Sequence, residues 1–167
     1  ITAATNGATL TIAMIDELID AVSGDLGALH MFMSKDMRRK FNNLLLAQSG
    51  AVNVVYQSMD GQGKVVTNYG GVQIHIVEDS WDFSTILAYD EICGTSAVTA
   101  SAYVCAFDEG MGVHGIYNGD GPTVDVKPVG ETLLATAPGQ VGRIEFYPGM
   151  CIRHPKAAAR LRGVTDS

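Results

Sequence analysis

The stretch LHMFMSKDMRRKFNNLL, residues 29–45, predicts a buried strand that runs directly into a helix. Residues 29–33 form a short, mostly apolar run, which is typical of a strand buried on both faces. Ser34 is a suitable N-cap, and Asp36 lies in the first helical turn, where the helix dipole favours an anion. The apolar residues that follow recur at helical spacing: Met37, Phe41, Leu44 and Leu45. We therefore expect a strand and then an amphipathic helix, which Gly50 ends.

Upstream of this stretch, a second amphipathic helix is predicted before Ser23 and Gly24. Its apolar positions recur at steps of three and four residues: Ile12, Ile15, Leu18, Ile19 and Val22. Acidic side chains lie on the opposite side: Asp16, Glu17 and Asp20. These segments give the order helix, strand, helix.

The middle of the sequence is typical of β-structure. Residues 52–57 and 64–67 flank Asp60-Gly61-Gln62-Gly63, which is a hairpin signal because these turn residues tolerate positive φ. A turn at residues 69–71 leads into residues 72–76, where apolar and polar side chains alternate as in a strand. Four further strands are expected: residues 102–107, 113–117, 124–129 and 141–147.

Two segments of the later sequence are expected to differ from strands. Residues 80–94 show no clear period and predict an ordered loop. Pro155 suits the first position of a helix, so we expect a short helix over residues 155–161. The strands follow one another while the helices are segregated, which favours α+β over a doubly wound sheet. The predicted fold class is α+β, with a mixed or antiparallel sheet, two main helices and a short C-terminal helix.

The composition excludes several classes of protein. Of the 167 residues, 47% are hydrophobic and 17% are charged, so burial of apolar surface can offset the entropy of ordering, and disorder is excluded. No apolar run approaches the roughly 20 residues that a membrane-spanning helix needs. The formal net charge of −7 disfavours nucleic-acid binding, which depends on clustered cations. Three cysteines without a C-x-x-C pair predict free thiols, and the residues after Ile1 predict no signal peptide.

Gly110-Met111-Gly112-Val113-His114-Gly115 matches the G-x-G-x-x-G pattern of dinucleotide-binding sites. Such a site needs a helix whose N-terminus opens at the glycines to hold the pyrophosphate. Residues 116–122, IYNGDGP, are incompatible with a helix because they are rich in turn-forming residues. We therefore expect a glycine-rich connection between strands, with no dinucleotide or other cofactor.

The histidines and cysteines do not form a metal-binding pattern. Cys151 and His154 make a single C-x-x-H pair without a second half, and the other histidines are far apart. We expect no metal site and no catalytic site. An enzymatic alternative stays open, in which a pocket is assembled from Cys105, Asp108, Glu109 and His114. A single-copy binding module is a further alternative, to which the lone Trp81 gives little support.

Basic residues are concentrated in two segments, residues 35–40 and 153–162, which hold 4 each of the 11 lysines and arginines. The remainder of the chain is acidic. The simpler interpretation is two solvated helix faces. The alternative is that patches of opposite charge meet between copies of the chain.

Several segments, in their order along the chain, carry a resemblance to a known family. They are residues 69–74, YGGVQI; 106–116, AFDEGMGVHGI; 143–152, RIEFYPGMCI; and 154–164, HPKAAARLRGV. Together they resemble the major capsid proteins of tailed bacteriophages with the Hong Kong 97-type fold. Two positions depart from the family, which often has Asn where this chain has Ser34 and His154.

The resemblance implies an axial domain over residues 1–140, followed by a closing strand and C-terminal helical turn over residues 141–167. The family's N-terminal arm, extended loop and spine helix have no counterpart in these residues. The implied function is structural: a subunit of an icosahedral capsid that assembles with copies of itself into pentamers and hexamers enclosing the DNA genome. Neither enzymatic activity nor a membrane partner is implied.

The resemblance also implies further partners and a location. Scaffold, protease and portal proteins are expected partners, and packaged DNA is contacted only indirectly. The shell is expected in the virion, after assembly in the bacterial host cytoplasm. An encapsulin-type nanocompartment shell has the same fold and is the nearest alternative, which a co-purified cargo enzyme in place of a DNA genome would identify.

Arg38, Arg39 and Lys40 form the candidate subunit interface. Three adjacent cations on a helix leave at least one of them away from the core face, where a neighbouring subunit can contact it. Replacing all three with Glu is expected to weaken assembly and to leave the circular dichroism spectrum intact. Unchanged assembly in that variant would exclude the interface.

Overall fold

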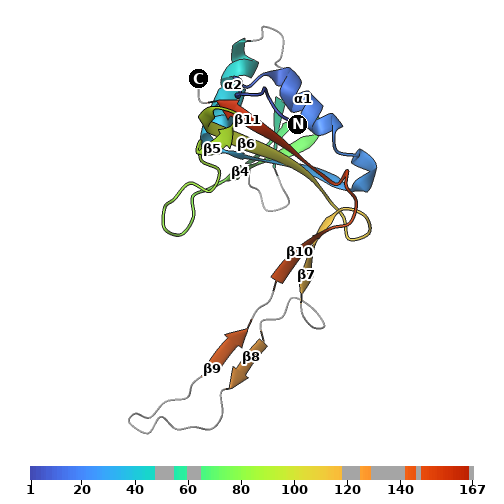
Figure 1. Ribbon diagram of the computed structural model, residues 1–167. Helices are drawn as coiled ribbons and strands as arrows, with labels where there is room; N and C mark the ends of the chain where they lie inside the picture. Colours follow the sequence, from blue (N-terminus) through green and yellow to red (C-terminus); the bar gives the residue numbers. More distant parts are fainter. Residues whose placement is uncertain (48–54, 60–64, 118–124, 129–141, 146–147, 166–167) are drawn as a thin grey trace. The chain divides into compact units, whose positions relative to one another are not determined.

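The computed structural model describes residues 1–47, 55–59, 65–117, 125–128, 142–145 and 148–165 (Figure 1). The chain forms two compact units. The first contains Ile1–Val113 and Ile152–Ser167, and the second contains His114–Cys151. The expected boundary between residues 140 and 141 lies outside the described residues and stays a prediction.

The helices of the first unit are α1 (Ile12–Asp20), the short 3-10 helix η1 (Gly24–Leu26) and α2 (Lys35–Ala47). At the start of α1, the Thr11 hydroxyl accepts a hydrogen bond from the Met14 backbone nitrogen at 3.3 Å. At the start of α2, the Ser34 hydroxyl accepts from the Met37 backbone nitrogen at 3.2 Å. Each cap satisfies an N–H group that has no partner within its helix. Both predicted helices and the Ser34 cap are confirmed.

The strands of the first unit are β1 (Ala28–Ser34), β2 (Val55–Met59), β3 (Val65–Tyr69), β4 (Val72–Val77), β5 (Glu91–Cys93), β6 (Ser96–Phe107) and β11 (Ala158–Thr165). β1 is parallel to β4 on one side and antiparallel to β6 on the other. β4, β3 and β2 continue the sheet in antiparallel order, and both β5 and β11 pair with β6. The sheet is therefore mixed, as predicted.

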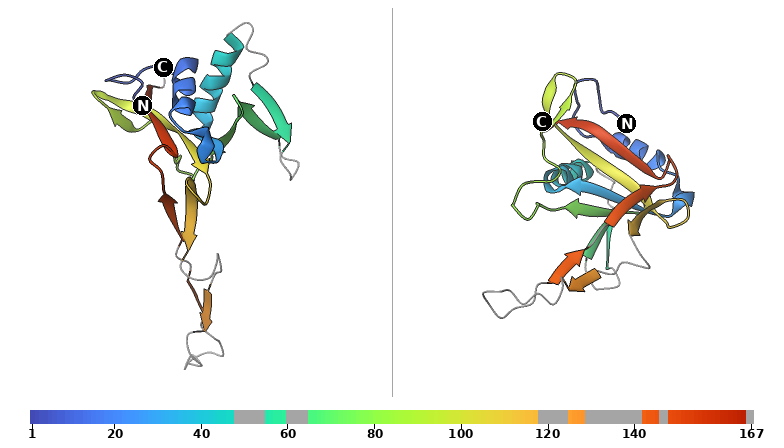
Figure 2. Two further views of the ribbon diagram at one scale, coloured as in Figure 1. Left: turned by 90° about the vertical axis from the view of Figure 1, so that its right-hand side faces the viewer. Right: turned by 60° about the horizontal axis from the view of Figure 1, so that its bottom comes forward.

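α1 and α2 lie together on one face of this sheet (Figure 2). Side chains alternate between the two faces of a strand, so every second residue points toward the helices. The fully buried core includes strand and helix residues: Met31, Met33, Met37, Phe41, Val104 and Leu161. The opposite face carries half-buried rings, among them His30 and Phe32 of β1 and His75 of β4.

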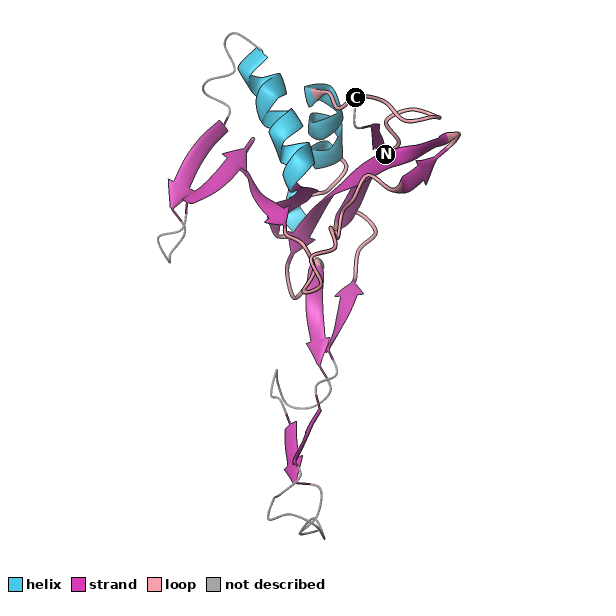
Figure 3. Cartoon of the chain, turned by 90° about the vertical axis from the view of Figure 1, so that its left-hand side faces the viewer, coloured by secondary structure: helices cyan, strands magenta, loops and turns pink. Residues whose placement is uncertain are grey.

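The predicted short helix over residues 155–161 is wrong. The segment enters β11, which pairs with β6 so that Ala158 lies opposite Cys105 (Figure 3). Leu161 is fully buried while its neighbour Arg160 is exposed, which is the period of a strand. Pairing along the length of β6 outweighs the local helix propensity of the alanines, because propensity is only a weak prior.

β11 also pairs with residues near the beginning of the chain. Isolated parallel bridges join Thr2 to Arg162 and Ala8 to Val164. The Ala8 backbone nitrogen donates to the Gly163 carbonyl at 2.9 Å. The register on β6 shifts between Leu161 and Val164, and Gly163 adopts a φ of 82° there, as at a glycine β-bulge. β11 is therefore held from both sides.

The remaining strands are β7 (Val113–Tyr117), β8 (Asp125–Pro128), β9 (Gly142–Glu145) and β10 (Pro148–Ile152). β8 and β9 pair antiparallel, with Asp125 opposite Glu145. β7 and β10 are hydrogen-bonded neighbours. The strands predicted near β7, β8 and β9 are confirmed, whereas β10 was not predicted.

The predicted hairpin is confirmed, because β2 and β3 pair antiparallel. The turn at Gly70 and Gly71 is confirmed as well, with φ values of 57° and 83° that favour glycine. The long loop predicted before residue 95 contains the short strand β5, which was not expected. The hairpin turn at residues 60–63 and the helix end at Gly50 lie outside the described residues.

Candidate functional site

The predicted interface cations lie on α2 in different surroundings. Arg39 keeps 70% of its side chain exposed and pairs with Asp36 one turn earlier on the same helix. The Lys40 ammonium donates to the Thr165 carbonyl at 3.0 Å and lies 5.0 Å from the centre of the Tyr89 ring. Lys40 therefore contributes to the fold of its own chain, whereas Arg39 is accessible to a partner.

Arg38, the third of the predicted interface cations, is half-buried. Within the part of the chain that the structure describes, its Nε atom is buried and makes no hydrogen bond. At least one of the three cations was expected to lie away from the core face, and Arg39 is the most exposed of them. The subunit interface itself stays a prediction.

The loop between β4 and β5 extends away from the sheet and is closed by its own hydrogen bonds (Figure 1). The Ser80 backbone nitrogen donates to the Ser84 carbonyl at 2.8 Å, and the Phe83 nitrogen donates to the Ser80 carbonyl at 2.9 Å. The Asp82 carboxylate accepts from the Ser84 hydroxyl at 2.6 Å and from the Ser84 nitrogen at 3.1 Å. These bonds to the charged form lower the pKa of Asp82. The loop therefore has a defined conformation.

Both ends of this loop contact α2. At one end, Asp79 forms a β-bridge with Thr85, and its carboxylate pairs with the Lys35 ammonium at 3.1 Å. At the other end, Tyr89 lies against the Lys40 ammonium. The basic helix α2 therefore fixes the base of the loop.

The closed loop exposes two large aromatic side chains. Trp81 is 92% exposed and Phe83 is 90% exposed. Phe83 also has a φ of 64°, which is unusual for a bulky residue. Large apolar groups that gather on a surface mark interaction sites more often than scattered single ones do. From the sequence, Trp81 gave only weak support for a binding module and Phe83 was not selected, although two aromatics in the polar segment Ser80-Trp81-Asp82-Phe83-Ser84 were the available signal.

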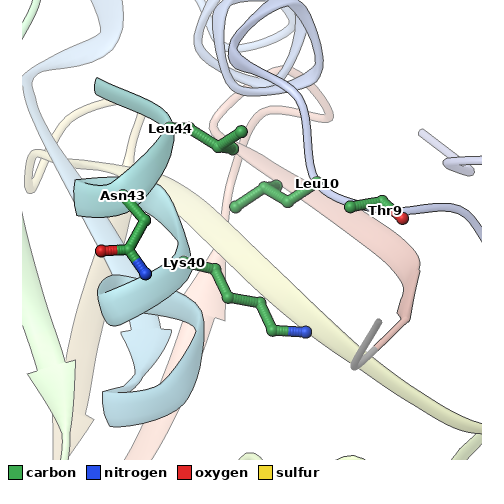
Figure 4. A pocket seen from close by; sticks show the side chains of 5 residues that line it. All are labelled: Thr9, Leu10, Lys40, Asn43 and Leu44. Carbon is green, nitrogen blue, oxygen red and sulfur yellow. The ribbon is translucent and has the colours of Figure 1, made fainter. Parts of the chain in front are cut away.

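A cavity of about 280 Å³ lies between α2 and the residues that precede α1 (Figure 4). It is lined by Thr9, Leu10, Lys40, Asn43 and Leu44. Leu10 and Leu44 point toward one another from the two walls, and Lys40 extends from α2 toward the end of β11, where its ammonium bonds Thr165. The cavity is mostly apolar with polar groups at its edge, and its volume is near the lower end for pockets that bind small ligands.

A second cavity, of about 340 Å³, is lined by Asp16, Ile19, Asp20, Tyr69 and Gly70. The Tyr69 hydroxyl donates to the Asp16 carboxylate at 2.8 Å. Burial, together with this hydrogen bond and the charge of Asp16, raises the pKa of Tyr69 to about 12. The hydroxyl therefore stays protonated at physiological pH and joins α1 to the sheet.

Two histidines meet on the face of the sheet opposite the described helices. His30 Nδ1 lies 2.8 Å from His75 Nε2, so one ring donates and the other accepts. His75 also stacks on Phe32, with 5.2 Å between ring centres. The pair joins residues 45 positions apart and depends on the parallel pairing of β1 with β4. No local pattern in the sequence predicts that pairing, which is why this cluster was missed.

The glycine-rich segment that begins at Gly110 continues into a strand, β7, and no helix opens at these glycines. The Asp108 carboxylate accepts hydrogen bonds from the backbone nitrogens of Gly110 and Met111, both at 2.8 Å. This geometry is a turn between strands, and the interpretation of the segment as a glycine-rich connection is confirmed.

The residues of the enzymatic alternative occupy separate environments. Burial raises the pKa of the Cys105 thiol, which opposes formation of a nucleophilic thiolate. The Asp108 carboxylate is engaged by the turn, and Glu109 is exposed. His114 belongs to the second compact unit, whereas the others belong to the first. The cavities described above are lined by other residues, and the expectation of no catalysis stays a prediction.

The described residues contain neither a cluster of metal ligands nor a membrane-spanning helix. In that part of the chain, no three His, Cys, Asp or Glu side chains are grouped so that they could hold a metal ion. None of the described helices has the length and apolar character needed to cross a membrane.

The fold of this chain is similar to that of a solved structure. The chain aligns over its full length with a protein in the cryo-EM structure of the holo-SrpI encapsulin complex from Synechococcus elongatus PCC 7942. The TM-score is 0.68 and the sequence identity is 14%. The fold is similar to that of an encapsulin. The chain spans about half of that protein, 53% of its length.

This likeness supports the capsid-like fold of the Hong Kong 97 type that the sequence resemblance implied, at the level of the α+β architecture. No protein-family model and no curated protein matches the sequence. Similarity of fold does not by itself establish similarity of function.

Proposed function

We propose that this chain is part of a structural protein that assembles with copies of itself into a closed shell. The similarity of fold to an encapsulin along the whole chain carries this proposal. No cavity described above combines nucleophile, base and acid in the manner of an active site.

The distribution of charge supports a role in self-assembly. The chain has a net charge of −7, yet α2 presents Arg39 to solvent beside other cations. Opposite charges on neighbouring copies would set their register and disfavour wrong contacts. Many weak contacts add to a stable shell because each copy is held by several neighbours at once.

The structural neighbour favours an encapsulin-type nanocompartment as the kind of shell. The resemblance of residues 143–152 and 154–164 to phage capsid proteins makes a bacteriophage capsid the second candidate. The two differ in their contents, since a nanocompartment encloses cargo protein and a capsid encloses DNA.

The experiment is to purify the gene product that carries this sequence and to examine it by sedimentation velocity and negative-stain electron microscopy. Closed particles of uniform diameter are expected. Their contents, measured by ultraviolet absorbance ratio and mass spectrometry, separate cargo protein from DNA. A protein that stays monomeric at high concentration would contradict the proposal.

A single substitution tests the charged contact more sharply than the triple one. Arg39→Glu is expected to lower the yield of particles at low ionic strength, because it reverses an exposed charge without touching the Lys40 contacts. Arg39→Lys keeps the charge and serves as the matched control. Equal yields from the two variants would exclude Arg39 from the contact.

A further inference from the structure

The aromatic loop, defined as residues 79–86, holds Trp81 and Phe83 almost entirely in water. Aromatic side chains supply large, rigid contact areas and are enriched among the residues that dominate interface energies. Neither side chain contributes to the hydrophobic core of its own chain. We therefore infer that these two exposed side chains contact a partner surface.

The aromatic loop is arranged for binding before any partner arrives. Its backbone is closed by the hydrogen bonds of Ser80, Phe83 and Ser84, and the Asp82 carboxylate braces it from within. The Lys35 ion pair fixes its base. A contact that is ordered in advance loses less conformational entropy on association. The loop thus has the properties of a preformed anchor.

The cavity beside α2 has the complementary properties. Its walls are formed by Leu10 and Leu44, and its volume of about 280 Å³ is on the scale of an aromatic side chain. Lys40 of the basic helix lies at its edge, whereas the tip of the aromatic loop carries the Asp82 carboxylate beside Trp81. Apolar shape and opposite charge therefore match between the two surfaces.

We propose that Trp81 of one copy of this chain docks into the cavity beside α2 of a neighbouring copy, and that Phe83 packs on the surface next to it. The proposal rests on the proposed function, because self-assembly supplies the second copy. The contact joins two different surfaces of the same protein, so it is heterologous and can close into a ring. Asp82 then approaches the positive charge of α2 on the neighbour.

The first test compares two variants of the purified gene product by sedimentation equilibrium. Trp81→Ala combined with Phe83→Ala is expected to weaken self-association at least tenfold, and the circular dichroism spectrum is expected to stay unchanged because both side chains are exposed. Met111→Ala removes another exposed apolar side chain and is expected to change association less than twofold. Equal effects of the two variants would overturn the proposal.

The second test locates the receiving surface. One variant carries Phe83→Cys, and a second variant, which is made larger by a tag, carries Asn43→Cys. In both variants Cys105 and Cys151 are replaced by serine, and the two proteins are mixed. Mild oxidation is expected to form the mixed disulfide dimer, whereas Met111→Cys in place of Phe83→Cys is expected to give none. Absence of the mixed dimer, or an equal yield from Met111→Cys, would overturn the assignment of the cavity.

The outcomes separate this proposal from the proposed function. Shells that form normally from the Trp81→Ala, Phe83→Ala variant would overturn the docking contact and leave the shell function intact. If the unchanged protein forms no shells, the function fails, and the mixed disulfide alone decides whether the two surfaces meet. A third outcome is that the protein sediments with phosphatidylserine-containing vesicles only when Trp81 is present, and that no mixed dimer forms. That outcome would assign the aromatic loop to a lipid surface and overturn the proposal.

Discussion

The two faces of the main sheet use the same strands differently. On the helix-covered face, Met31 and Met33 of β1 are completely buried. On the open face, His30 and Phe32, which alternate with them, are half-buried and make ring contacts and a hydrogen bond. A shift of one residue in register would exchange the faces. The covered face therefore buries its apolar side chains completely, whereas the rings of the open face stay partly in contact with water.

The largest predicted effect tests the covered face. Phe41→Ala removes a fully buried ring of α2 and is expected to lower the free energy of unfolding by about 3–5 kcal/mol, through lost burial and a cavity. Urea unfolding followed by circular dichroism measures this change.

Phe32→Ala is the matched substitution on the open face. Because part of its ring is already in contact with water, the expected loss is about 1–2 kcal/mol. Similar losses for the two variants would break the distinction between the faces.

An intermediate effect is expected at Tyr69, which is buried against Phe41, with 5.0 Å between ring centres, and bonds Asp16. Tyr69→Phe is expected to lower stability by about 1 kcal/mol at neutral pH through loss of the hydrogen bond. Folding raises the pKa of Tyr69 from 10 to about 12, so the folded state favours the neutral hydroxyl.

The stabilisation by Tyr69 is fully present below pH 10 and is lost as the pH rises through about 12. The difference in unfolding free energy between the wild type and Tyr69→Phe should therefore shrink over this interval. Unfolding by urea at a series of alkaline pH values measures it. A constant difference would show that the hydroxyl is not linked to folding.

The smallest predicted effect tests the open face. His75→Phe keeps an aromatic ring that can stack on Phe32 but removes the hydrogen bond to His30. The expected loss is about 0.5–1 kcal/mol, because His30 can bond water instead. Thermal unfolding at neutral pH detects the change. A loss as large as that of Phe41→Ala would show that the histidine pair is a part of the core.

The helices and strands that were predicted correctly are those whose pattern lies within a few neighbouring residues of the sequence. Both helices follow from apolar spacing, and the Ser34 cap follows from the residue type at the strand-to-helix junction. The parallel pairing of β1 with β4 has no such signal, since it joins segments more than 40 residues apart. The His30–His75 contact depends on that pairing and was missed for the same reason.

The C-terminal segment shows how tertiary pairing overrides local propensity. Three alanines after Pro155 favoured a helix, yet the alternation of Leu161 with Arg160 and Arg162 was a signal for the strand that forms. The candidate site was predicted only in part. The cations of α2 were identified by charge alone, but the exposure of Trp81 and Phe83 depends on hydrogen bonds within a loop that has no period.

The position of β11 has a consequence for the order in which the protein folds during synthesis. β11 lies between β6 and the residues around Thr2 and Ala8, although it is made after every other strand described here. The first unit therefore completes its sheet only when β11 has left the ribosome. Until then the part of β6 that pairs with β11 is an unpaired edge, so a pause in translation before β11 would favour aggregation.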